Sequence, residues 1–169
     1  MKRRAYTLTA LALVALLTAL HTQAHEDSHA GHGSMNMMEH GPEQKPWGIA
    51  GQVDKVDRTV EIRMGDSMRF TPEKLQVRQG ETIRFVHHND GKLLHEFVLG
   101  TRQTLDEHAA EMLKASGMAH GEAYMAHVAP EAQDEMIWTF NRAGEFEFAC
   151  LIAGHYQAGM RGSIEVLAN

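Results

Sequence analysis

The sequence predicts an all-β protein folded as a β-sandwich, and two observations support this. From Trp47 onward, short segments alternate apolar and polar residues, which is the pattern of a strand with one buried face. Turn-forming residues separate these segments at regular intervals, as in Asn89-Asp-Gly91. Many short strands with frequent turns are typical of a sandwich.

The predicted strands follow one another with turn residues between them. In order they cover residues 48–55, 58–64, 68–70, 74–78, 81–88, 93–99, 135–140, 145–149 and 162–167. We expect the first two to be joined by a turn around Val56-Asp57. Ile83, Phe85 and His87 fall on one face of their strand, which indicates a buried face.

Residues 103–117 interrupt the strand pattern, because they are rich in helix-forming residues. Thr104 is a candidate cap for this helix, and Gly117 a candidate end. A narrow apolar face is formed by Leu105, Ala109, Met112 and Leu113. The sequence therefore predicts a helical insertion rich in Met and His at about residues 103–127.

The first 24 residues have the pattern of a secretory signal peptide. Lys2-Arg3-Arg4 is a basic start, and the apolar run Leu8–Leu20 is too short to span a bilayer comfortably. Thr22-Gln-Ala24 fits a cleavage site, so the mature chain would begin at His25 in the periplasm. The ordinary secretory pathway is favoured, although the two arginines leave twin-arginine export open. No cysteine near Ala24 offers a lipid anchor, so we expect no membrane anchor in the mature form.

Residues 25–45 carry several His and Met side chains but almost no other apolar bulk. Such a segment cannot bury a core, so we expect it to be disordered. Imidazole binds Cu²⁺ and similar ions, whereas thioether selects Cu⁺. The tail therefore predicts copper binding in either oxidation state, although a solvated leader without a role is the alternative.

The charge balance argues against nucleic acid as a partner. The chain has 16 Lys and Arg against 22 Asp and Glu, a formal charge of −6, and the predicted signal peptide removes only basic residues. Nucleic-acid binding depends on cationic side chains that neutralise phosphates. The balance fits a protein that attracts cations or basic partners.

One short stretch, Cys150–Met160, carries the strongest chemical signal. It contains the single cysteine of the chain, with His155 five positions later and Met160 five positions after that. Thiolate, imidazole and thioether suit copper, and two His with one Cys and a weak axial Met form a blue-copper site. The second imidazole must come from elsewhere, and His95 is the best candidate. Zinc is disfavoured, because a thioether is a poor zinc ligand.

These residues resemble the cupredoxins, the plastocyanin and azurin superfamily. The resemblance rests on Gly144–Cys150 leading to His155, Met160 and Gly162–Val166, and on the first-half segments Phe70–Pro72, Gly80–Phe85, Asn89 and His95–Phe97. It covers roughly residues 47–169, and the chain departs from it at Ala153, where the family often has Pro. The nearest likeness is to bacterial periplasmic copper-tolerance cupredoxins with His- and Met-rich segments.

The resemblance implies a Greek-key sandwich over residues 46–169 and a type 1 copper site. It also implies that the backbone N–H of Glu96 donates a hydrogen bond to the Cys150 sulfur. His155 is expected near the surface, while His87 and His88 are left out of the copper shell.

A second set of donors extends the copper prediction. Met-x-His units recur at residues 118–120 and 125–127, close to the predicted helix. The candidate auxiliary copper ligands are His25, His29, His32, Met35, Met37, Met38 and His40 in the tail, and His108, Met112, Met118, His120, Met125 and His127 beyond it.

The sequence favours a periplasmic copper-binding protein that acts in copper tolerance and homeostasis. A mobile one-electron carrier between periplasmic redox partners is the alternative, because the type 1 ligand set alone suits that role. The His- and Met-rich segments favour tolerance, since a plain carrier needs neither. An enzyme is disfavoured, because copper oxidases need a second catalytic copper centre. The expected partners are copper ions and a redox or copper-transfer protein.

Overall fold

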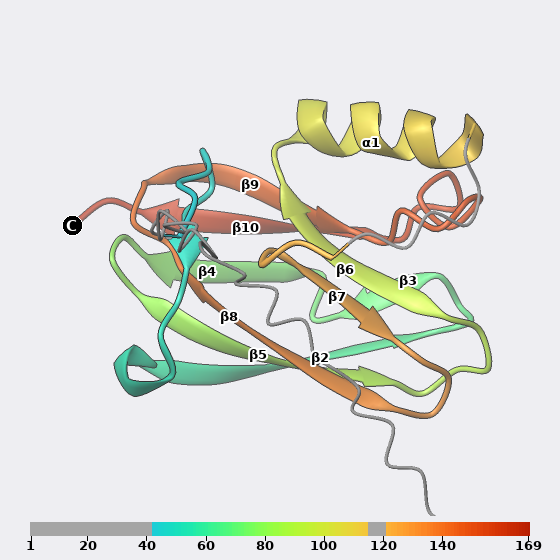
Figure 1. Ribbon diagram of the computed structural model, residues 1–169, viewed down its shortest axis with the longest axis horizontal. Coiled ribbons are helices and arrows are strands. Elements are labelled where there is room, and N and C mark those ends of the chain that lie inside the picture. The colour runs from blue at the N-terminus through green and yellow to red at the C-terminus, as the bar shows by residue number, and fades with distance from the viewer. Residues whose placement is uncertain (1–41, 115–120) are drawn as a thin grey trace, which may run out of the picture. The chain divides into compact units, whose positions relative to one another are not determined.

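The structure is a computed structural model that describes residues 42–114 and 121–169. Within these ranges, the strands form two five-stranded sheets, accompanied by one α-helix (Figure 1). The predicted β-sandwich with a short helix is therefore confirmed. The signal peptide and residues 25–41 of the tail lie outside the described residues and stay predictions.

The first sheet has β5 at its centre. Its strand order is β1 (Ile49–Ala50), β8 (Gln133–Thr139), β5 (Thr82–Asn89), β2 (Arg58–Gly65) and β3 (Arg69–Thr71). β2 runs parallel to β5, and the other neighbours are antiparallel. Ile83, Phe85 and His87 of β5 are fully buried, as their spacing predicts.

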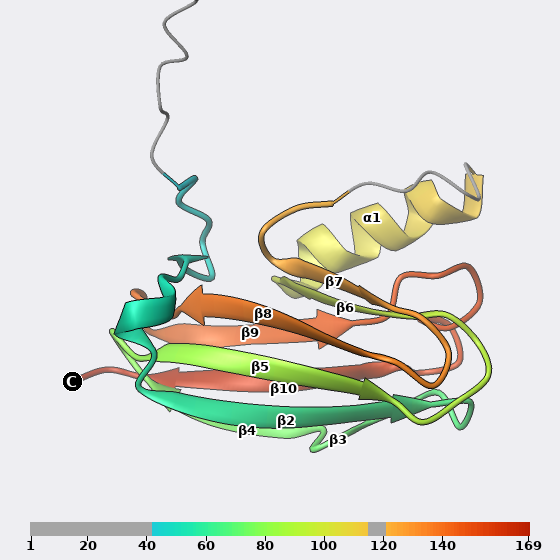
Figure 2. The same cartoon turned by 60° about the horizontal axis from the view of Figure 1, so that its bottom comes forward.

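The second sheet carries the strand ends that flank the candidate site. Its order is β4 (Lys74–Arg78), β10 (Arg161–Leu167), β9 (Gly144–Ala149), β6 (His95–Gly100) and β7 (Met125–Val128). β4 is parallel to β10, and the remaining pairs are antiparallel. Figure 2 shows β8, β5 and β2 as one layer, with β9 and β10 in the layer behind it.

Aromatic side chains join the two sheets in the core. Phe97 of β6 stacks on Phe148 of β9 with ring centroids 4.8 Å apart, and Phe70 of β3 meets Phe148 edge-on at 5.1 Å. Trp138 of β8 donates its indole N–H to the Trp47 carbonyl at 2.9 Å. Because these rings are rigid and closely packed, they fix the strands that carry the site.

The helix α1 (Arg102–Lys114) confirms the predicted helix, but its cap differs from the expected one. Thr101 is the cap: its hydroxyl accepts the Thr104 N–H at 3.2 Å, and the Thr104 hydroxyl accepts the Thr101 N–H at 3.0 Å. The sequence alone did not show which of these two threonines caps the helix. No helix among the described residues is long and apolar enough to cross a membrane.

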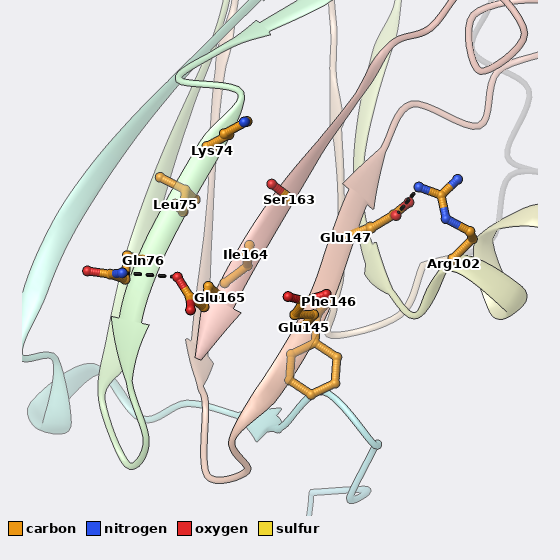
Figure 3. A pocket seen from close by; sticks show the side chains of 10 residues that line it. All are labelled: Lys74, Leu75, Gln76, Arg102, Glu145, Phe146, Glu147, Ser163, Ile164 and Glu165. Carbon is orange, nitrogen blue, oxygen red and sulfur yellow. Dashed lines mark hydrogen bonds and ion pairs between the residues drawn. The ribbon is translucent and has the colours of Figure 1, made fainter. Parts of the chain in front are cut away.

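α1 packs against β6 and β9 on the outer side of the second sheet, and both views show it alongside β6 (Figures 1 and 2). Its buried residues Leu105, Ala109 and Met112 pack with Val98 of β6 and Tyr156 in a second apolar cluster. Arg102, at the start of the helix, forms an ion pair with Glu147 of β9 (Figure 3). The predicted apolar face is thus confirmed except for Leu113, which is 55% exposed.

Two predicted elements were wrong in type or pairing. Residues 48–55 are the two-residue β1 followed by a 3₁₀ turn, Val53–Lys55, and β1 pairs with β8 instead of β2. Val53 is 66% exposed, so this stretch lacks the buried face that would sustain a strand. Met125–Val128 is strand β7, although we expected it inside the helical insertion.

His87 is a polar side chain within the aromatic core. It is 0% exposed, its ring lies 4.5 Å from that of Phe97, and neither nitrogen has a hydrogen-bond partner among the described residues. Burial lowers the pKa of His87 from 6.5 to about 4, because the charged imidazolium is poorly solvated there. The folded protein therefore keeps His87 neutral at a pH where the unfolded chain protonates it.

This difference predicts acid sensitivity that depends on His87. Because the unfolded state binds the proton first, His87 destabilises the fold as the pH falls from about 6.5 towards 4. Between pH 7 and pH 5, the wild type should lose about 2 kcal/mol more unfolding free energy than His87→Leu. Urea titrations of metal-free protein at both pH values measure this difference.

Phe85→Leu is the matched control, because Phe85 is equally buried on the same face of β5 but carries no titratable group. This variant should lose stability at both pH values alike and keep the wild-type difference between them. If His87→Leu lost as much unfolding free energy as the wild type between pH 7 and pH 5, His87 would not be the cause of the acid sensitivity.

Candidate metal centre

A pocket on the outer side of the second sheet does not offer the thiolate, imidazole or thioether donors that suit copper. Its lining side chains come from β4, β9 and β10 and from Arg102 of α1, and none is His, Cys or Met (Figure 3). Gln76 donates to Glu165 there at 3.0 Å, a pairing typical of a solvated sheet face. The metal-binding donors gather elsewhere.

The loop Cys150–Met160 joins β9 to β10. Cys150 directly follows β9, Met160 directly precedes β10, and the Cys150 N–H donates to the Met160 carbonyl at 3.0 Å. This bond continues the ladder between the two strands beyond the Arg161–Ala149 pair. Both Cys150 and Met160 are 0% exposed, so the ends of the loop are held inside the core.

Tight turns within the loop place His155. The His155 N–H donates to the Ile152 carbonyl at 2.9 Å, and the Met160 N–H donates to the His155 carbonyl at 3.1 Å. Gly154 and Gly159 adopt φ angles of 93° and 91°, which residues other than glycine rarely adopt. These turns fold the imidazole of His155 back towards Cys150.

His95 is brought next to Cys150 by a neighbouring strand. It is the first residue of β6, which pairs with β9 through Val98 and Ala149. The Glu96 N–H donates to the Cys150 sulfur at 3.3 Å, the bond that the resemblance implied. The strand pairing therefore sets a buried imidazole beside the thiol.

The structure brings three of the four predicted ligands into one cluster. One ligand atom from each of His95, Cys150 and His155 lies within 4.8 Å of the others. The Cys150 sulfur is 3.3 Å from His155 Nδ1, and the two imidazole centroids are 5.0 Å apart. Met160 is buried in the same core cluster as Cys150.

The state of these donor atoms fits a metal ion. His95 Nδ1 is buried and has no hydrogen-bond partner among the described residues, although leaving such a nitrogen unpaired costs free energy. Its other nitrogen, Nε2, lies 3.4 Å from an Asp66 oxygen. One sulfur and two imidazole nitrogens beside a buried thioether form a set that suits copper.

Burial also governs protonation at the site. It raises the pKa of the Cys150 thiol to about 12, although the Glu96 N–H acts in the opposite direction. Burial, followed by the neighbouring His95, lowers the pKa of His155. Without metal, the thiol therefore keeps its proton at neutral pH, and a bound metal must displace it.

The described auxiliary candidates do not form one cluster. Met112 and Met125 pack in the apolar cluster beneath α1, whereas His127 Nε2 lies 3.0 Å from a carboxylate oxygen of Glu96. His108 lies on α1 beside a surface pocket. The other candidates lie outside the described residues: His25, His29, His32, Met35, Met37, Met38, His40, Met118 and His120.

Two carboxylates near the site were missed by sequence reasoning. Glu96 is 3% exposed, faces His127 across β6 and β7, and has one carboxylate oxygen without a described partner. Asp66 lies in the turn between β2 and β3, in the gap between the predicted strands 58–64 and 68–70, where no pattern marked it as part of a site. The register of Glu96 with His127 depends on a long connection, so no local pattern could have revealed it.

Comparison with known proteins decides the family. A sequence profile of copper binding proteins, the plastocyanin/azurin family, matches residues 56–167. The chain belongs to this family. The match spans both His95 and the Cys150–Met160 loop, so the clustered donors lie within the family's own fold.

Relatives with similar sequences cover most of the chain. A copper-resistant cuproprotein, CopI, from Rubrivivax gelatinosus is 46% identical over 93% of this chain and 94% of its own length. The CopI of Pseudomonas aeruginosa is 40% identical over 71% of this chain and 82% of its own. Among solved structures, auracyanin B matches the fold with a TM-score of 0.61 at 17% identity, over 71% of this chain and 96% of its own.

The burial of Cys150 predicts an unreactive thiol in the metal-free protein. Only the thiolate is nucleophilic, and a pKa of about 12 leaves roughly a thousandth of the thiolate that an ordinary cysteine near 9 would have. Iodoacetamide labelling at pH 8, followed by mass spectrometry, should therefore be slower by about that factor. Labelling should become fast in urea, and equally fast labelling of the folded protein would contradict the buried site.

Proposed function

We propose that this copper-binding protein acts in the periplasm in copper tolerance and holds a type 1 copper. His95, Cys150 and His155 would be the equatorial ligands, and Met160 the weak axial ligand. The observation that carries the proposal is the convergence of one ligand atom each from His95, Cys150 and His155, with His95 Nδ1 buried and unpaired among the described residues.

Each residue would contribute differently to such a site. Copper there supplies one-electron redox chemistry, and the Cys150 thiolate supplies a strongly coupled donor once its proton has left. His95 is fully buried, whereas His155 is only partly buried and would be the ligand nearest to solvent. The Glu96 N–H reduces charge on the sulfur, which tunes the potential.

The relatives and the His- and Met-rich segments support a role in tolerance. The copper-resistant cuproproteins resemble this chain over most of its length. The tail offers imidazole and thioether donors outside the type 1 site, which would let the protein bind additional copper. We propose a binding role and no catalysis, in keeping with copper-binding relatives.

A second candidate role is electron transfer to a protein partner. Leu93 and Leu94, in the loop that leads into His95, are 46% and 45% exposed. Exposed apolar side chains next to a redox ligand would suit transient docking of a partner. An electron carrier would need neither the His- and Met-rich tail nor the auxiliary copper donors.

The spectrum of copper-loaded protein tests the type 1 site. Chain starting at His25 should develop an intense thiolate-to-copper band with Cu²⁺, because Cys150 is the only thiol. Cys150→Ser should lose the band completely. A wild type without the band would remove Cys150 from the ligand set and defeat the proposed function.

Deletion of residues 25–45 separates tolerance from electron transfer. If the tail binds copper, the deletion should lower survival under copper and reduce copper uptake by Cys150→Ser, while the type 1 band remains. His127→Ala in the deleted protein should reduce any remaining uptake, since His127 is the partly exposed imidazole beside a buried carboxylate among the described auxiliary residues. Unchanged survival, with impaired electron flow in a strain lacking the protein, would favour the carrier.

A further inference from the structure

The turn between β2 and β3 holds a carboxylate in a built cradle. One oxygen of Asp66, Oδ1, accepts the N–H groups of Lys92 and Leu93 at 3.1 and 3.2 Å, and Oδ2 accepts the Lys92 N–H at 2.9 Å. These donors come from the loop between β5 and β6, far along the chain. The loop that ends in His95 is therefore folded around the Asp66 carboxylate.

The cradle is tightly constrained. A Cβ added to Gly91 would lie 2.2 Å from Asp66 Oδ1, so only glycine permits this approach. The buried Asn89 donates to the carbonyls of Leu93 and Val128 at 2.7 and 2.9 Å and accepts the Gly91 N–H at 2.9 Å. Hydrogen bonds with Asp66 and Asn89 therefore hold the loop, and they fix the position of the carboxylate relative to His95.

The same carboxylate faces the imidazole of His95. Asp66 Oδ1 lies 3.4 Å from His95 Nε2, a long hydrogen bond, while the ring itself is 0% exposed. An ionised carboxylate accepts hydrogen bonds but has no proton to donate, so it favours the tautomer with hydrogen on Nε2. That tautomer leaves the lone pair on Nδ1, the buried nitrogen that has no hydrogen-bond partner among the described residues. Because Nε2 faces Asp66, Nδ1 is the nitrogen free to ligate a metal together with Cys150 and His155.

We propose that Asp66 is a positioning residue that fixes the metal-binding tautomer of His95 and shifts the site towards Cu²⁺. This inference rests on the proposed type 1 site. A carboxylate behind a ligating histidine orients the ring and raises its basicity. Its negative charge stabilises the more highly charged oxidation state, so the reduction potential is lower than it would be without Asp66.

Asp66→Asn tests the charge while keeping the cradle. The amide oxygen can still accept the Lys92 and Leu93 N–H groups, so the loop should fold. Asp90→Asn is the matched control, because Asp90 lies in the β5–β6 loop that surrounds Asp66, carries the same charge and pairs with the exposed Arg63 at 2.8 Å. Both variants remove one negative charge near the site, but only Asp66 contacts His95.

The expected result is a change in the preference between oxidation states. In Asp66→Asn, the ratio of Cu²⁺ to Cu⁺ affinity should fall on the order of tenfold, which raises a one-electron potential by about 59 mV. Voltammetry of the copper-loaded variants measures the shift, and Asp90→Asn should stay close to the wild type. Equal shifts in the two variants would reduce the effect to general electrostatics and overturn the proposal.

A metal-free measurement tests the tautomer without relying on copper. Nitrogen-15 NMR of the metal-free wild type should show His95 protonated on Nε2, and Asp66→Asn should weaken that preference. Protonation of Nδ1 in the wild type would overturn the proposal even if no variant folded. A wild type without the copper band would defeat the type 1 site itself, whereas a normal band with an unchanged potential in Asp66→Asn would defeat only the role of Asp66.

Discussion

The hydrogen bond from the Glu96 N–H to the Cys150 sulfur joins two parts of the chain on which the candidate site depends. One part is β6, which begins with His95, and the other is the end of β9 with its loop. A shift of one residue in the pairing of these strands would turn His95 to the opposite face. The site therefore exists only in one register, and the stacked Phe97 and Phe148 help to hold that register.

The metal-free site is an electrostatic compromise. Its thiol stays protonated because it is buried, and its most buried imidazole nitrogen has no partner among the described residues. Both features destabilise the fold, and the packing of the rigid aromatic core offsets this destabilisation. Holding donors in place before the metal arrives reduces the rearrangement that binding requires, and the same rigidity would limit rearrangement between two oxidation states.

Local sequence patterns revealed the metal-binding donors of the loop but not the carboxylates that lie beside the site. The spacing of Cys150, His155 and Met160 is a short-range signal, and alternation located the principal strands within a few residues. Asp66 could not be found in this way, because its role depends on backbone N–H groups from a loop more than twenty residues away. The pairing of Glu96 with His127 likewise follows from the β6–β7 register, which no sequence spacing encodes.

The position of the proposed ligands along the chain also bears on how much copper would stabilise the fold. Cys150, His155 and Met160 share one loop, so an unfolded chain still presents three of the four donors close together, without His95. Affinity for the unfolded state subtracts from the stabilisation that a bound ion provides. Copper would thus stabilise the native state by less than its full binding free energy, and some copper would remain on the chain after thermal unfolding.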